Sequence, residues 1–366
     1  AALPIMAASI LAEGTHVIKN VPDLLDIHVM TDILQDIGCQ VDFQDKEVVI
    51  ETSTLNSSHI PETLMRRMRS SIFLMGPLLA KFGRVQFYPP GGCAIGERKF
   101  DLHLRGLEAL GAKVEESTNT IICTASELRG SEISLDYPSV GATENIMMAA
   151  AKAKGTTIIY NAAREPEIYD LQNYINAMGG LVMGAGTDTI TIQGVDELHA
   201  CTYEVIPDRI VAGTLMIAAA ATKGSVQLMN VRPQHLTSLT HVLKRMGVQI
   251  TIDDDIMIVN GAKNLQAVDR VITSPYPAFP TDLQSQIMVL LSISEGVSVI
   301  KETVFEGRFK HVDELYRMGA DIRVDLNTAF IRGVPRLYGA SVEATDLRAG
   351  AALVIAGLCA AGTTVV

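Results

Sequence analysis

Tryptophan is absent from the sequence, aromatic residues are few, and negative charges outnumber positive ones. Aromatic residues make up 5% of the 366 residues, and 30 Lys and Arg stand against 41 Asp and Glu, a formal net charge of −11. The scarcity of aromatic residues argues against a platform for stacking nucleic-acid bases. The negative net charge argues against a broad surface for binding nucleic acid or an anionic membrane. A small anionic substrate stays compatible with this composition, because a few arginines can reverse the potential locally.

Cysteine is also scarce, and its spacing excludes two common structural devices. The five cysteines are Cys39, Cys93, Cys123, Cys201 and Cys359, and no pair has CxxC spacing. We therefore expect neither a disulfide framework nor a structural zinc site, and the sequence offers no other metal or cofactor motif. This usage is typical of a reducing, cytoplasmic compartment.

Targeting and membrane segments are not expected either. Residues 1–12 lack the basic segment of a secretory signal peptide. Residues 349–366 form the most apolar stretch and are long enough to raise the question of a membrane helix. Because this stretch is rich in Ala and Gly and matches an internal repeat, we predict a buried helix that leads into a strand.

An internal repeat is the most informative feature of the sequence. A phrase of small or charged residues, a glycine and a β-rich run recurs at intervals of 66 to 72 residues, with its glycines at Gly14, Gly83, Gly155, Gly224, Gly296 and Gly362. A second phrase, a glycine flanked by apolar residues, follows in five copies at Gly38, Gly111, Gly179, Gly247 and Gly319. Such a period indicates a supersecondary unit that is stacked several times.

Each repeat predicts the same order of elements. Positions four and one before the second glycine are apolar in all five copies, which is the spacing of an amphipathic helix that ends at a left-handed glycine. Alternating segments such as 249–252 and 256–259 then predict a pair of strands. Six units of strand, helix and two strands, joined by Ala-rich helices, indicate an α/β protein with two domains, 1–207 and 208–366, whose sixth unit is truncated.

Two histidines break the repeat pattern. His103 and His311 stand eight residues before the second glycine in the second and fifth copies, where the other copies have Met or Leu. Arg308 stands at the expected start of the fifth helix, where a positive charge opposes the helix macrodipole. We therefore expect the middle unit of each domain to turn a polar helix start towards a cleft between the domains, although a structural role for each histidine remains an alternative.

Three further segments carry residues suited to chemistry. Cys93 lies in the glycine-rich segment YPPGGCAIGER, where a nearby cation, Arg98, and a helix start favour anions and lower the pKa of a thiol. Asp282 follows a rigid Pro-Thr turn, and Asp346 precedes an Ala-rich helix. A helix cap explains either aspartate alone, but it does not explain Arg348, which has the wrong sign for that helix start.

These segments, in order, resemble one enzyme family. GGCAIGER, PSVGATEN, AAREPEI, IPDRI, PAFPTDLQSQ, KETVFEGRF and ATDLRAG are similar to motifs of the UDP-N-acetylglucosamine 1-carboxyvinyltransferases, and the likeness spans essentially the whole chain. The resemblance implies two inside-out α/β barrel domains, each of three repeated βαββ-type units. It also implies transfer of the enolpyruvyl group of phosphoenolpyruvate to the 3′-hydroxyl of UDP-N-acetylglucosamine with release of phosphate. This is the first committed step of peptidoglycan synthesis and hence part of cell-wall biogenesis, cell shape and division.

The resemblance assigns roles to individual residues. Cys93 matches the family's general acid, which also forms a covalent adduct with substrate and is the target of fosfomycin, and Asp282 matches the proposed base. The substrate-binding residues implied are Arg69, Arg98, Lys99, Phe100, Asp101, Leu102, Ser139, Val140, Gly141, Val304, Arg308, Asp346 and Arg348. Among these, Arg98 and Arg348 match arginines that hold phosphoenolpyruvate. The resemblance implies no metal and no cofactor, and no nucleic-acid or membrane partner.

The sequence departs from the family pattern at a few positions. Lys99 stands where the family usually has proline, Gly307 replaces a usual asparagine, and Tyr276 replaces a usual histidine. The family also has a Lys-Asn pair immediately before the residues that match Ala1, and a C-terminal arginine in the sixth unit. We therefore expect the sequence to be trimmed at both termini.

Three other functions share some of these sequence features. A shikimate 3-phosphate enolpyruvyl transferase shares the repeat but lacks the loop cysteine, and an RNA 3′-phosphate cyclase would call for a basic stripe that this acidic chain lacks. A non-catalytic paralogue that binds UDP-N-acetylglucosamine and regulates wall synthesis is the third alternative. The presence of Cys93, Asp282, Arg98 and Arg348 favours the enzyme, because a binding protein needs no acid.

Overall fold

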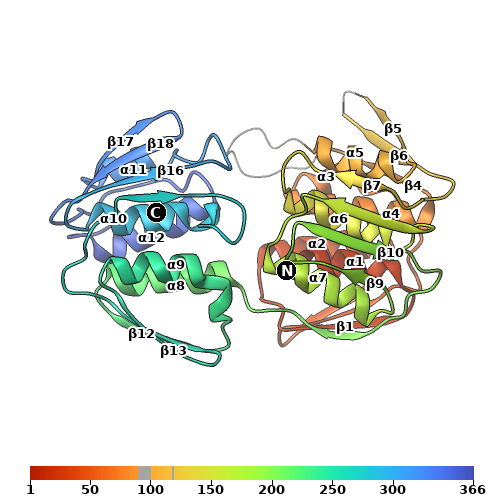
Figure 1. The fold of residues 1–366 in the computed structure, drawn as a ribbon, viewed down its shortest axis with the longest axis horizontal. Helices are drawn as coiled ribbons and strands as arrows, with labels where there is room; N and C mark the ends of the chain where they lie inside the picture. Colours follow the sequence, from red (N-terminus) through yellow and green to blue (C-terminus); the bar gives the residue numbers. More distant parts are fainter. Residues whose placement is uncertain (90–99, 118) are drawn as a thin grey trace. The chain divides into compact units, whose positions relative to one another are not determined.

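The structure is a computed structural model, and it describes residues 1–89, 100–117 and 119–366. These residues form two compact units that divide between Ile206 and Pro207. We call them unit 1 and unit 2, and each is described by itself (Figure 1).

Unit 1 is built from short strands and helices that alternate along the chain. Its helices are α1 (Ala2–Ala8), α2 (Leu25–Asp36), α3 (Glu62–Met65), α4 (Met75–Phe82), α5 (Asp101–Ala109), α6 (Val140–Ala150) and α7 (Pro166–Ala177), with 3₁₀ turns η1 (Ser9–Leu11) and η2 (Arg69–Leu74). Its strands are β1 (Thr15–Lys19), β2 (Gln40–Gln44), β3 (Glu47–Glu51), β4 (Arg84–Phe87), β5 (Lys113–Glu116), β6 (Ile121–Thr124), β7 (Glu132–Ser134), β8 (Thr156–Tyr160), β9 (Leu181–Met183), β10 (Thr189–Gln193) and β11 (Thr202–Glu204).

The three sheets of unit 1 repeat one topology. Their orders are β11-β1-β3-β2, β4-β6-β5 and β7-β8-β10-β9, so the last strand of each repeat always lies in the middle of an antiparallel trio. Strand β7 adds to β8 in parallel and thereby joins the second repeat to the third. Strand β11 adds to β1 in parallel, which returns the end of the third repeat to the first and closes the unit into a ring.

Unit 2 repeats the same order of elements. Its helices are α8 (Arg209–Ala221), α9 (Thr237–Arg245), α10 (Gln284–Ser292), α11 (Val312–Arg317) and α12 (Leu347–Cys359), with 3₁₀ turns η3 (Pro233–Leu236) and η4 (Thr281–Leu283). Its strands are β12 (Ser225–Leu228), β13 (Gln249–Asp253), β14 (Ile256–Asn260), β15 (Arg270–Ile272), β16 (Val297–Lys301), β17 (Asp321–Asp325) and β18 (Thr328–Arg332). Two sheets, β12-β14-β13 and β15-β16-β18-β17, have the topology of unit 1.

The Ala-rich helices that connect the repeats occupy the interior. In unit 2 the helices α8, α10 and α12 contact one another in pairs, and all nine residues of α10 are buried. Figure 1 shows these helices with the two sheets of the unit on either side. In unit 1, α4 packs against α6, of which residues 142–150 are all buried. A helix that is apolar on every side needs such a position, because no face of it suits water.

The local predictions agree with the structure except at one helix start and at the end of the sequence. The five glycines of the second phrase have φ between 88° and 107°, the left-handed conformation that the predicted helix ends require. The apolar stretch at the chain end forms α12, and no helix in the described residues is long and apolar enough to span a membrane. The helix is only partly buried, because Val354 and Leu358 are exposed, and the residues after it form isolated bridges at Ala361 and Val365 in place of the predicted strand. The fifth repeat's helix, α11, begins only at Val312, so Arg308 lies in the preceding turn and the macrodipole argument does not apply to it.

Close packing of α4 on α6 generates a stability prediction. A Cβ on Gly76 would lie 2.4 Å from the backbone oxygen of Asn145, so Gly76→Ala must push the two helices apart. We expect a loss of about 1–3 kcal/mol in the free energy of unfolding, measured by denaturant titration. Gly224→Ala is the matched control, because its nearest neighbour is the movable hydroxyl of Thr222 at 3.2 Å. Equal stability of the two variants would contradict the packing argument.

Candidate functional site

The predicted site residues fall into two groups, one in each unit. Cys93, Arg98 and Lys99 lie outside the described residues. Unit 2 holds Asp282, Val304, Arg308, Asp346 and Arg348, and unit 1 holds Arg69, Phe100, Asp101, Leu102, Ser139, Val140 and Gly141. Each group is built from elements far apart in the sequence.

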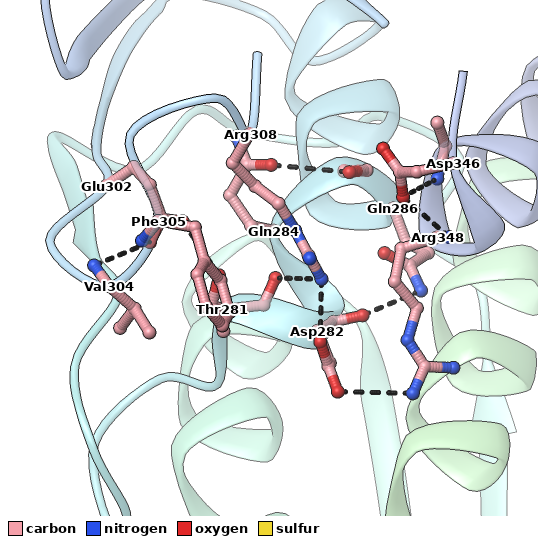
Figure 2. A network of polar contacts seen from close by, with 12 residues as sticks. Thr281, Asp282, Gln284, Gln286, Glu302, Val304, Phe305, Arg308, Asp346 and Arg348 are labelled. Atoms are coloured by element: carbon pink, nitrogen blue, oxygen red, sulfur yellow. Dashed lines mark hydrogen bonds and ion pairs between the residues drawn. The ribbon is translucent and has the colours of Figure 1, made fainter. Parts of the chain in front are cut away.

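The unit 2 group centres on Asp282, which bridges two arginines (Figure 2). Asp282 lies in the 3₁₀ turn η4, which leads into the buried helix α10. Its Oδ1 accepts a hydrogen bond from Arg308 at 2.6 Å, and its Oδ2 accepts one from Arg348 at 3.1 Å. The side chain of Arg308 is only 3% exposed, whereas that of Asp282 is 39% exposed. One carboxylate therefore holds two guanidinium groups at a spot that solvent still reaches.

The two arginines control the protonation of Asp282. Burial alone would raise the pKa of the carboxyl group, but the charges and hydrogen bonds of Arg348 and Arg308 outweigh burial and lower that pKa below its usual value. Asp282 is consequently a carboxylate at neutral pH, ready to accept a hydrogen bond or a proton.

The arginines retain donors of their own. The Nε atom of Arg308 is buried and has no hydrogen-bond partner in the described chain, and its guanidinium carbon lies 5.4 Å from the ring centre of Phe305. Arg348 stands at the start of α12, where Asp346 accepts the backbone N–H groups of Arg348 and Ala349. Asp346 is therefore a helix cap, as one of the sequence interpretations had it, whereas Asp282 caps no helix and pairs with arginines instead.

Glu302 is a residue of this group that the sequence analysis missed. It is 2% exposed, and its Oε1 accepts the N–H groups of Val304 at 2.8 Å and Phe305 at 3.1 Å. Its Oε2 accepts the hydroxyl of Thr281 at 3.0 Å. Glu302 thus ties the loop of Val304 to the turn that presents Asp282 (Figure 2).

The unit 1 group lies at the start of helix α6. Ser139 is the N-cap, and its side-chain oxygen accepts the N–H of Ala142 while its carbonyl accepts that of Thr143. Val140 and Gly141 form the first turn, whose N–H groups favour anions, as at any helix start. In helix α5, which begins at Asp101, the buried His103 faces this turn: a Cβ built on Gly141 would lie 3.2 Å from its Nε2.

Burial keeps His103 neutral. Desolvation, with a smaller contribution from the charge of Arg69, lowers the pKa of His103 to about 3. Arg69, at the start of η2, is therefore near enough to act on the ring. The histidine of the same repeat position in unit 2, His311, behaves alike, because burial lowers its pKa to about 4. These are the two histidines that broke the repeat pattern.

The comparisons with known proteins identify the family. The family model described as EPSP synthase (3-phosphoshikimate 1-carboxyvinyltransferase) matches residues 1–366. The chain belongs to this family.

Two relatives with curated names share more than half of their aligned residues with this chain. The chain is 53% identical over 364 residues to a protein named UDP-N-acetylglucosamine 1-carboxyvinyltransferase 2 from Caldanaerobacter subterraneus subsp. tengcongensis, which covers 100% of this chain and 87% of the relative. It is 52% identical over 364 residues to UDP-N-acetylglucosamine 1-carboxyvinyltransferase 1 from Carboxydothermus hydrogenoformans. This alignment covers 100% of this chain and 86% of the relative. The chain is accordingly an enolpyruvyl (1-carboxyvinyl) transferase.

Solved structures confirm the predicted fold class. The enolpyruvyl transferase NikO from Streptomyces tendae superposes with a TM-score of 0.88 at 23% identity, covering 98% of this chain and 85% of that one. An EPSP synthase from Acinetobacter baumannii superposes with a TM-score of 0.74 at 20% identity, and the superposition covers 98% of this chain and 87% of that one. At these identities the likeness concerns the fold alone.

The other cysteines of this transferase lie in surroundings that do not activate a thiol. Burial raises the pKa of Cys39 to about 11 and of Cys123 to about 12, and it also raises those of the half-buried Cys201 and Cys359. These four thiols are therefore poor nucleophiles. The described residues contain no group of three or more His, Cys, Asp or Glu arranged to hold a metal ion. A cavity of about 550 Å³ between α9, β15 and loop 276–279 is lined by none of the predicted site residues.

The position of Glu302 predicts a graded response to substitution. Glu302→Ala leaves the partly buried N–H groups of Val304 and Phe305, and the hydroxyl of Thr281, without their acceptor, so we expect a loss of about 1–3 kcal/mol in the free energy of unfolding. Glu302→Gln keeps one acceptor oxygen and should lose much less. Denaturant titration of both variants measures this difference, and an alanine variant as stable as the glutamine variant would refute the role.

The pKa of His103 predicts an unusual titration. Nitrogen NMR of the imidazole should show a neutral ring from roughly pH 8 down to pH 5, where an ordinary histidine with a pKa of about 6.5 is charged. Because the folded-state pKa is the lower one, the unfolded chain binds the extra proton. The free energy of unfolding should therefore decrease as the pH falls below about 6.5, by up to about 1.4 kcal/mol per pH unit from this group. An imidazolium signal from His103 at pH 6 in the folded protein would contradict the assignment.

Proposed function

We propose that this enzyme transfers the enolpyruvyl group from phosphoenolpyruvate to the 3′-hydroxyl of UDP-N-acetylglucosamine and releases phosphate. The observation that carries the proposal is that proteins of that name are more than 50% identical to the chain over its whole length. The arrangement of Asp282 with two arginines supports it, because phosphoenolpyruvate is a compact polyanion that suits guanidinium groups.

The proposed reaction is an addition followed by an elimination. The thiol of Cys93 donates a proton to the methylene carbon of phosphoenolpyruvate, and the sugar 3′-oxygen attacks the neighbouring carbon while its proton passes to the Asp282 carboxylate. The bond to the phosphate oxygen then breaks, the departing phosphate takes the proton held by Asp282, and a methyl proton returns to the Cys93 thiolate, which restores the double bond and both side chains. Acid and base assistance of this kind contributes about 10²–10⁴-fold in rate.

Substrate binding should change the pKa of Asp282 in the direction that this reaction needs. In the free site, the arginines lower the pKa of the carboxyl group and weaken it as a base. When phosphoenolpyruvate occupies the guanidinium group of Arg348, the positive charge of that arginine is shared with the substrate. The pKa of Asp282 should then rise towards its ordinary value, so that the base becomes effective only with substrate bound.

The acceptor side of the proposal rests on unit 1. The start of α6 at Ser139, Val140 and Gly141, with Arg69 nearby, offers backbone donors and positive charge to the diphosphate of the nucleotide sugar. The remaining proposed contacts are Arg98, Lys99, Phe100, Asp101, Leu102, Val304 and Asp346. We further propose that the enzyme works in the cytoplasm in peptidoglycan synthesis and that Cys93 is the thiol that fosfomycin modifies.

The test is release of phosphate from phosphoenolpyruvate with UDP-N-acetylglucosamine, with shikimate 3-phosphate, or without an acceptor. We expect release only with UDP-N-acetylglucosamine, and a loss of at least about 100-fold in kcat for Cys93→Ala and for Asp282→Asn. Asp325→Asn, an exposed aspartate in strand β17 of the same unit, is the control and should keep full activity.

The acceptors separate the alternatives. Turnover with shikimate 3-phosphate would show that the acceptor is not UDP-N-acetylglucosamine. The proposal that the enzyme transfers an enolpyruvyl group would still stand. Binding of UDP-N-acetylglucosamine by a folded chain without any phosphate release would support the regulatory paralogue and overturn the enzymatic role.

A further inference from the structure

We propose that Gln286 and Thr214 are positioning residues, which hold the backbone of Asp282 in the place where its carboxylate reaches two arginines. The inference rests on the proposed function for the role of Asp282 as the base. It concerns two residues to which the sequence analysis assigned no role.

The amide of Gln286 contacts the residue that it would position. Gln286 lies in α10, four residues after Asp282, and its Nε2 donates a hydrogen bond to the backbone carbonyl of Asp282 at 3.0 Å (Figure 2). The same Nε2 donates to the hydroxyl oxygen of Thr214, in α8, at 3.1 Å. A carbonyl oxygen can only accept, so the amide atom that faces it is the nitrogen. One side chain therefore ties the turn that carries Asp282 to a helix 72 residues earlier in the chain.

Helix α8 also supports this turn through packing. The turn η4 consists of Thr281, Asp282 and Leu283. A Cβ built on Gly213, the residue before Thr214, would lie 2.6 Å from Cδ1 of Leu283, so the absence of a side chain there makes room for the leucine against α8. Thr281 is held through its hydroxyl by Glu302. Each of the three residues of the turn thus has a contact of its own.

The polar side chain at position 286 does not serve the stability of the fold. Gln286 is 0% exposed, and the residues that follow it in α10, 287–291, are apolar and buried. Its nitrogen bonds to Asp282 and Thr214, and its Oε1 is buried without a hydrogen-bond partner in the described part of the chain. A buried acceptor without a partner destabilises a protein, and a methionine of similar length would avoid this. The contacts of the nitrogen therefore explain the amide better than packing does.

The place of the Asp282 backbone determines whether one carboxylate can serve two arginines. Its Oδ1 lies 2.6 Å from a nitrogen of Arg308, and its Oδ2 lies 3.1 Å from a nitrogen of Arg348. The side chain of Asp282 is 39% exposed, so its own packing does not fix it. A displacement of a reacting group by about 1 Å can cost about 10²-fold in rate. A loosened turn should therefore slow the reaction while the substrate contacts of unit 1 stay in place.

Three substitutions separate the hydrogen bonds of the amide from the volume of the side chains. Gln286→Met keeps the length of the side chain and loses both hydrogen bonds. Thr214→Val keeps the shape of the threonine and loses the hydroxyl oxygen, whereas Thr214→Ser keeps that oxygen. Gln249→Met and Thr251→Val, at exposed positions of β13 in the same unit, are the matched controls.

The first readout is kcat for phosphate release from phosphoenolpyruvate with UDP-N-acetylglucosamine. We expect kcat to fall at least about tenfold in Gln286→Met and at least about threefold in Thr214→Val, while Thr214→Ser and both controls stay within about twofold of the parent. The double variant should lose no more than Gln286→Met alone, because both substitutions remove the same contact.

Calorimetric titration with UDP-N-acetylglucosamine separates positioning from binding and from loss of folded enzyme. The Kd should change less than about threefold in every variant, because the substitutions move the base rather than the nucleotide contacts proposed for unit 1. The stoichiometry of the titration counts the folded molecules, so that kcat can be expressed per folded enzyme.

The second readout is the titration of the Asp282 carboxyl group by carbon NMR, which needs no turnover. The charged groups that act on it are Arg348, in α12, and Arg308, in the turn before α11, and both lower its pKa. A carboxylate that has moved away from them loses this effect, so the pKa of Asp282 should be higher in Gln286→Met than in the parent. The control Gln249→Met should titrate like the parent.

Other outcomes would overturn the inference. A folded Gln286→Met variant with the kcat and the Asp282 titration of the parent would refute it, and so would a rise in Kd as large as the loss in kcat. If Gln286→Met does not fold, equal kcat values of Thr214→Val and Thr214→Ser refute it. If the parent neither binds nor converts UDP-N-acetylglucosamine, the proposed function fails. The NMR titration then tests the positioning by itself: a higher pKa of Asp282 in Gln286→Met supports it, and an unchanged pKa refutes it.

Discussion

The burial of the apolar connecting helices is the constraint on which the rest of this structure depends. A helix such as α10, with every residue buried, has no face for water and must be surrounded by other elements. The three-stranded antiparallel repeats surround such helices, and no single repeat could do so alone. In unit 1 the parallel pairing of β11 with β1 returns the third repeat to the first and closes the arrangement.

Several of the predicted site residues lie at or just before the starts of the connecting helices. Asp282 precedes α10, Arg348 begins α12, and Gly141 lies in the first turn of α6. Helix starts expose N–H groups and carry partial positive charge, so each of these helix starts suits a phosphorylated group before any side chain is added. The arginines then add full charges, and Asp282 keeps two of these close together in the absence of substrate.

Both units also place a neutral histidine at the same repeat position. His103 and His311 are buried, and desolvation lowers the pKa of each below the physiological range. Neutral rings avoid the cost of burying a charge beside Arg69 and Arg308, which an imidazolium would repel. Each unit therefore has a polar but uncharged group whose pKa an arginine helps to lower.

The sequence by itself determined the features that depend on neighbours along the chain. Apolar spacing predicted the helices, glycines such as Gly319 predicted their ends, and the motifs predicted the enzyme family and its fold. Tertiary structure alone decided the contacts between distant segments. Glu302 binds Thr281 across 21 residues, Asn145 orients His103 across 42, and the true start of α11 left Arg308 in a turn where it reaches Asp282. A hydrogen bond needs two atoms at one place, and periodicity along a chain specifies the face of an element but not the partner that meets it.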